Sequence, residues 1–76
     1  MASFDAAEAR IAFNAYRQGG PITDKGLTEA LRCIDQLVET VVVVPGFELA
    51  LREAVRLQVA LRDIVLSRRM EEASRG

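Results

Sequence analysis

The sequence contains a single cysteine, Cys33, and neither histidine nor tryptophan. One thiol cannot form a disulfide within the chain, and without histidine it cannot build a zinc site. We therefore expect no metal and no cofactor. A chain of 76 residues buries a smaller share of its surface than a larger domain does, and half of these residues are apolar. With disulfides and metals excluded, association is the remaining way to stabilise so small a fold.

The chain also lacks an excess of charge of either sign, since ten basic residues face eleven acidic ones. Nothing in this balance favours DNA, RNA or an anionic membrane as a partner. The first residues lack the features of a signal peptide, and no apolar run reaches the roughly 20 residues that span a bilayer. We expect a cytoplasmic protein. Lys25 is the single lysine among the basic residues, and this arginine bias hints at a bacterial or phage source.

Catalytic patterns are missing as well. The serine, threonine and tyrosine hydroxyls have no histidine to activate them, and the acidic pairs do not describe a cleft. Gly19-Gly20 lacks the preceding strand and the Gly-Lys-Ser/Thr ending of a phosphate-binding loop. We therefore expect a protein that is not an enzyme.

Two breaks, Gly19-Gly20-Pro21 and Pro45-Gly46, divide the chain into three segments. We predict a single all-α domain over residues 1–76, with a short helix at about 4–18 and a long antiparallel helical hairpin at about 23–44 and 46–72. Ser3 is the expected N-cap of the first helix, with Asp5 in its first turn, and Gly19 is its expected terminator. Two weak, alanine-rich stripes run along this helix.

The second helix has one apolar face. Thr23 is its expected N-cap and Asp24 its first residue. The seam alternates steps of four and three residues, and the opposite face, which includes Glu29, is polar. The seam residues are Leu27, Leu31, Ile34, Val38 and Val41. The valines at 41–44 could instead form a short strand, because β-branched residues favour one. Pro45 should end the helix.

The third helix is apolar on most of its circumference. One stripe should pack on the second helix, and a second stripe remains to be covered. The first stripe comprises Phe47, Ala50, Ala54, Leu57, Leu61 and Ile64. The second comprises Leu51, Val55, Val59, Leu66 and Met70.

Three arrangements could cover the second stripe. The first helix could lie over it in a monomeric three-helix bundle. A symmetric homodimer could pair the third helices in a larger helical bundle, which we favour because two-fold dimers are the commonest oligomers. The stripe could also be reserved for a different protein.

We therefore expect a non-enzymatic protein–protein interaction module, such as a small adaptor, chaperone or inhibitor. The candidate interface is the second stripe together with two arginines that would add specificity. It comprises Leu51, Val55, Val59, Arg62, Leu66, Arg69 and Met70. The alternatives are a dimeric nucleic-acid-binding regulator and a small subunit of an enzyme complex. The nucleic-acid-binding regulator is the runner-up, but nucleic acid is an unlikely partner because acidic residues largely cancel the arginines of the third helix.

Overall fold

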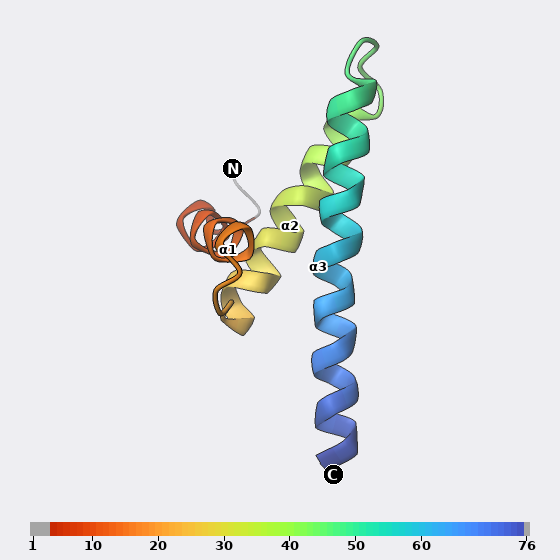
Figure 1. The fold of residues 1–76 in the computed structure, drawn as a ribbon. Helices are drawn as coiled ribbons and strands as arrows, with labels where there is room; N and C mark the ends of the chain where they lie inside the picture. Colours follow the sequence, from red (N-terminus) through yellow and green to blue (C-terminus); the bar gives the residue numbers. More distant parts are fainter. Residues whose placement is uncertain (1–3, 76) are drawn as a thin grey trace.

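The computed structural model describes residues 4–75, which form three α-helices (Figure 1). These are α1 (Ala6–Gln18), α2 (Asp24–Val41) and α3 (Glu48–Arg75). The described part of the chain contains no strand, so the all-α prediction is confirmed. No helix within it is long and apolar enough to cross a membrane.

The first helix begins two residues later than the sequence predicts. Asp5, which the sequence predicted to lie in the first turn, is instead the N-cap. One of its carboxylate oxygens accepts from the backbone N–H groups of Ala7 and Glu8. The predicted cap, Ser3, lies outside the described residues. Gly19 ends the helix with φ 72°, as predicted, because a left-handed conformation suits a residue without a side chain.

The second helix begins as predicted and ends early. The Thr23 hydroxyl accepts from the backbone N–H of Gly26 at 2.9 Å. The predicted end at residue 44 is wrong, because α2 stops at Val41 and the following valines form a turn. Val44 donates its N–H to the Val41 carbonyl, so the strand alternative is also wrong. Pro45 disfavours helical geometry at Val44, the residue before it, and α2 has already ended three residues earlier.

The third helix is displaced toward the C-terminus, since it starts at Glu48 and runs to Arg75 instead of covering 46–72. Gly46 adopts φ 93° in the preceding turn, a conformation that excludes it from a helix. The last residues, Met-Glu-Glu-Ala-Ser-Arg, are mostly good helix formers, which explains why the helix continues.

Helix packing joins α1 to α2 and α2 to α3, with no such packing of α1 on α3. In Figure 1, α1 is seen almost along its axis while α3 lies in the plane of the picture, so α1 runs across the other two helices. The core cluster is small and consists of Ala12, Leu27, Ala30 and Leu61. The arrangement in which α1 covers the second stripe of α3 is therefore wrong.

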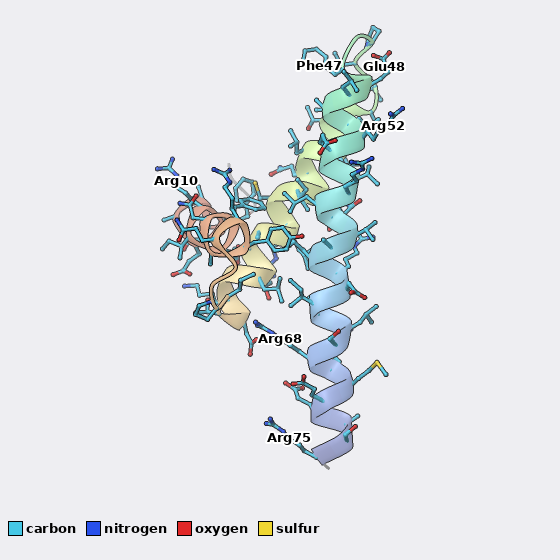
Figure 2. All side chains as sticks on the ribbon, in the orientation of Figure 1. Arg10, Phe47, Glu48, Arg52, Arg68 and Arg75 are labelled. Carbon is cyan, nitrogen blue, oxygen red and sulfur yellow. The ribbon has the colours of Figure 1, made fainter. Side chains whose placement is uncertain are left out.

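Side-chain bonds between α2 and α3 show that the chain direction reverses between them. Asp35, late in α2, accepts from Gln58 and from Arg62. Asp24, at the start of α2, accepts instead from Arg68, which also donates to the carbonyl of Ile22 at 2.6 Å. Figure 2 shows Arg68 extending from α3 toward the start of α2. Beyond Arg68, α3 continues past the beginning of α2.

Candidate interaction surfaces

A largely exposed apolar surface runs along one side of α3, beside the face that packs on α2. We call it the outer stripe, and it consists of Leu51, Val55, Val59, Leu66 and Met70. Val59 is 60% exposed, Leu66 56% and Met70 71%, whereas Leu51 is half-buried. In Figure 1, α1 and the first half of α2 lie to the left of the middle of α3, and no helix lies on its right. Most of the second apolar stripe predicted from the sequence is therefore exposed in the structure.

The other predicted stripe of α3 faces the core over its central part. Ala54 and Leu61 are buried, and Leu57 and Ile64 pack against the core cluster. Its first two members depart from the prediction, because Phe47 lies in the turn and Ala50 in the first turn of α3, where both stay exposed. The packing of this stripe leaves the outer stripe on a different side of the same helix.

The two arginines of the predicted interface have different surroundings. Arg62 lies 3.2 Å from the Asp35 carboxylate, so its guanidinium is held on the α2 side of the stripe. Arg69 is exposed in the part of α3 beyond Arg68. Arg69 is therefore the arginine whose guanidinium can form an ion pair with a partner protein.

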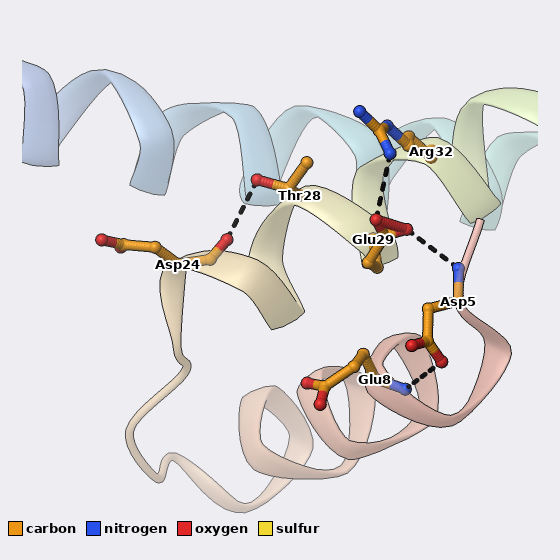
Figure 3. A network of polar contacts seen from close by, with 6 residues as sticks. All are labelled: Asp5, Glu8, Asp24, Thr28, Glu29 and Arg32. Carbon is orange, nitrogen blue, oxygen red and sulfur yellow. Dashed lines mark hydrogen bonds and ion pairs between the residues drawn. The ribbon is translucent and has the colours of Figure 1, made fainter. Parts of the chain in front are cut away.

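The sequence pattern predicts Glu29 on the polar, solvent-facing side of α2, and this prediction is wrong. Glu29 is only 8% exposed, because α1 crosses α2 at this point. One carboxylate oxygen accepts from the Asp5 backbone N–H at 2.9 Å, and the other lies 3.0 Å from Arg32 (Figure 3). A residue from α2 therefore completes the capping of α1.

A groove of about 620 Å³, which the sequence did not predict, is lined by residues of all three helices. Its floor and walls are largely apolar, with charged side chains among the lining residues. The lining residues are Phe13, Tyr16, Arg17, Cys33, Ile34, Leu37, Glu53, Arg56 and Leu57. Two features of the sequence could have indicated this groove. One is the alanine-rich stripe of the first helix that includes Phe13 and Tyr16, and the other is the apolar pair Cys33 and Leu37 beside the seam of the second helix.

Cys33 is half-buried in this groove. Burial raises the pKa of its thiol, because the charged thiolate would lose solvation. A raised pKa lowers the fraction of thiolate, the reactive form, at neutral pH. The surroundings of Cys33 therefore suit an apolar contact better than nucleophilic chemistry.

A third apolar surface surrounds the turn between α2 and α3. Val43, Val44 and Phe47 are exposed there, and Leu49 follows on the first turn of α3. We call this surface the tip. It lies at one end of α3, and the segment beyond Arg68 lies at the other (Figure 1).

Residues 4–75 contain no group of three or more acidic or cysteine side chains that could hold a metal ion. No protein-family model matches the sequence, and comparisons with curated proteins and with solved structures give no match.

Proposed function

We propose that this protein is a non-enzymatic interaction module, a small adaptor, chaperone or inhibitor of a bacterial or phage system. It acts through the outer stripe of α3 and forms a homodimer in which antiparallel hairpins build a helical bundle. The observation that carries the proposal is the exposure of Val59, Leu66 and Met70 along one side of a single helix. Exposed apolar side chains gathered on one side of a helix are typical of an interaction site in soluble proteins.

The composition of the core supports the proposal. Among the described residues, the buried apolar side chains are Ala9, Ala12, Leu27, Ala30, Ile34, Ala54 and Leu61. Four of these seven are alanines, whose burial contributes little because apolar stabilisation scales with buried area. Larger apolar side chains lie outside this set, on the outer stripe and the tip. Covering them by association would add the burial that the isolated chain lacks.

The test replaces Val55 and Val59 together by aspartate. We expect loss of association, with the molar mass from light scattering falling to that of one chain, because charges would have to be buried at the interface. Binding of any partner that co-purifies at fixed stoichiometry should be lost in the same variant.

The matched control is Ile11→Asp. Ile11 is 61% exposed on α1, almost the same as Val59, and it lies outside the outer stripe. This variant should keep the molar mass and the partner binding of the unmodified chain. If the Val55/Val59 double variant retains both properties, the outer stripe is not the interaction surface.

A further inference from the structure

We propose that the outer stripe is covered by the outer stripe of a second copy, with the two α3 helices antiparallel and Val55 of one copy opposite Leu66 of the other. This inference rests on the proposed function and adds the orientation and register of the pair. Its support comes from the spacing of the stripe, the charges on its flank and the surfaces at the two ends of α3.

The stripe has a regular spacing of 11 residues. Positions 51, 55 and 59 recur as positions 62, 66 and 70, so that Val55 is followed by Leu66 and Val59 by Met70. Eleven residues make three turns at about 3.67 residues per turn, close to the 3.6 of a straight helix. The stripe therefore stays on one side of α3 from Leu51 to Met70, a length of about 29 Å. A second helix can lie against it over that whole length.

The spacing is also the same in both directions. From Leu51 to Met70 the stripe positions are separated by steps of 4, 4, 3, 4 and 4 residues, with Arg62 included. Reversing the helix exchanges 51 with 70, 55 with 66 and 59 with 62. An antiparallel copy therefore meets each stripe position with another stripe position, which is the self-complementarity that a two-fold interface requires.

Arg62 distinguishes the two possible orientations. In a parallel pair it would face the Arg62 of the second copy, and like charges would meet within the apolar stripe. In the antiparallel pair it lies opposite Val59, where its aliphatic stem can cover the valine, and it is offset by three residues, about 4.5 Å along the axis, from the Arg62 of the second copy. Its guanidinium can then stay with Asp35 of its own chain, the contact seen in the structure.

Charges on the flank of the stripe favour the same register. Arg56 and Asp63 lie on one flank, two turns apart, and both are exposed. In an antiparallel pair the same flanks meet, and Arg56 falls two residues, about 3 Å along the axis, from Asp63 of the second copy. The two-fold axis creates this pair twice. Within its own chain, Arg56 has only an exposed contact of 3.5 Å with Glu53, so it can reorient toward a partner.

The antiparallel arrangement also brings together the two ends of α3. The segment beyond Arg68 of one copy would lie beside the tip of the other, where Val44 and Phe47 are exposed. Met70 in that segment is also exposed, so apolar side chains are available on both surfaces. The same register thus covers the outer stripe and part of the tip.

Cross-linking tests the orientation. In chains that carry Cys33→Ser, one population receives Val55→Cys and another, with a longer tag, receives Leu66→Cys. Mild oxidation of the mixture should give mainly the disulfide between the two populations. Val55→Cys alone should not link to itself, because the two thiols would be about 16 Å apart along the axis. Efficient linkage of Val55→Cys to itself would show a parallel pair and overturn the inference.

A charge exchange tests the register. Arg56→Asp and Asp63→Arg should each weaken dimerisation by about 10-fold, since each creates two repulsive pairs, and the double variant should restore it. Failure of the double variant to recover would contradict the register.

Different results would overturn the second copy as the occupant of the outer stripe and the outer stripe as an interaction surface. A monomer that forms no cross-links, yet loses a different protein partner on substitution of Val55 and Val59, would overturn the second copy as occupant and retain the outer stripe as the interaction surface. A monomer indifferent to that substitution would overturn both.

Discussion

Glu29 is the residue whose role depends most on tertiary structure. The N-cap residue of a helix often has its backbone N–H satisfied by a glutamate three positions later. Glu8 occupies that position in α1, but the carboxylate that accepts from Asp5 belongs to Glu29 of α2. This bond spans 24 residues of sequence and fixes the start of α1 on α2. Arg32 balances the charge that is buried with it.

We predict that Glu29→Ala destabilises the protein by about 1–2 kcal/mol, because it leaves the Asp5 N–H without its acceptor and removes the partner of Arg32. Urea unfolding followed by circular dichroism measures the change. Glu39→Ala is the control, since Glu39 is exposed on the same helix and both variants gain the same helix propensity. Equal stability of the two variants would show that the buried contact has no net effect.

At the scale of elements, α1 and α2 approach closely because small residues line their contact. A Cβ on Gly26 would lie 3.3 Å from the Ala12 Cβ and 2.9 Å from the Thr23 hydroxyl oxygen. The first contact would push α1 away from α2, and the second would disturb the N-cap of α2. The absence of a side chain at Gly26 thus permits both the N-cap of α2 and the close approach of α1 to α2.

Gly26→Ala should therefore cost about 1 kcal/mol or more, although alanine normally stabilises a helix relative to glycine by about that amount. Gly20→Ala provides the comparison, because its Cβ would meet only the Ala15 carbonyl oxygen at an ordinary 3.7 Å. The urea midpoints of the two variants give the measurement. A Gly26→Ala protein at least as stable as the unmodified chain would mean that the helices can separate without cost.

The sequence predicted those features of the elements that depend on neighbouring residues. Thr23 caps α2 and Gly19 ends α1 because these effects are confined to one helical turn. The end of α2 at Val41 was missed, since valine fits both a last helical turn and a tight turn before proline. The burial of Glu29 and the groove around Cys33 depend on where α1 crosses α2, and helical periodicity does not contain that information.

At the scale of the whole molecule, large apolar side chains lie mostly outside the core. Leu61 is the largest fully buried side chain in the described part of the protein, and much of the core around it is alanine. The outer stripe of α3 is well exposed by comparison. The stripe was predicted from the sequence because the periodicity of α3 depends on that helix alone. Its exposure required the structure, which shows that α1 packs on α2 instead.

The most direct test of the account is the molar mass of the unmodified chain measured by sedimentation equilibrium over a wide concentration range. We predict a reversible rise from the 8.4 kDa of one chain to twice that value as the concentration increases. A mass of 8.4 kDa at every concentration, with Val55 and Val59 substitutions also leaving partner binding unchanged, would contradict the claim that the outer stripe of α3 is an interaction surface.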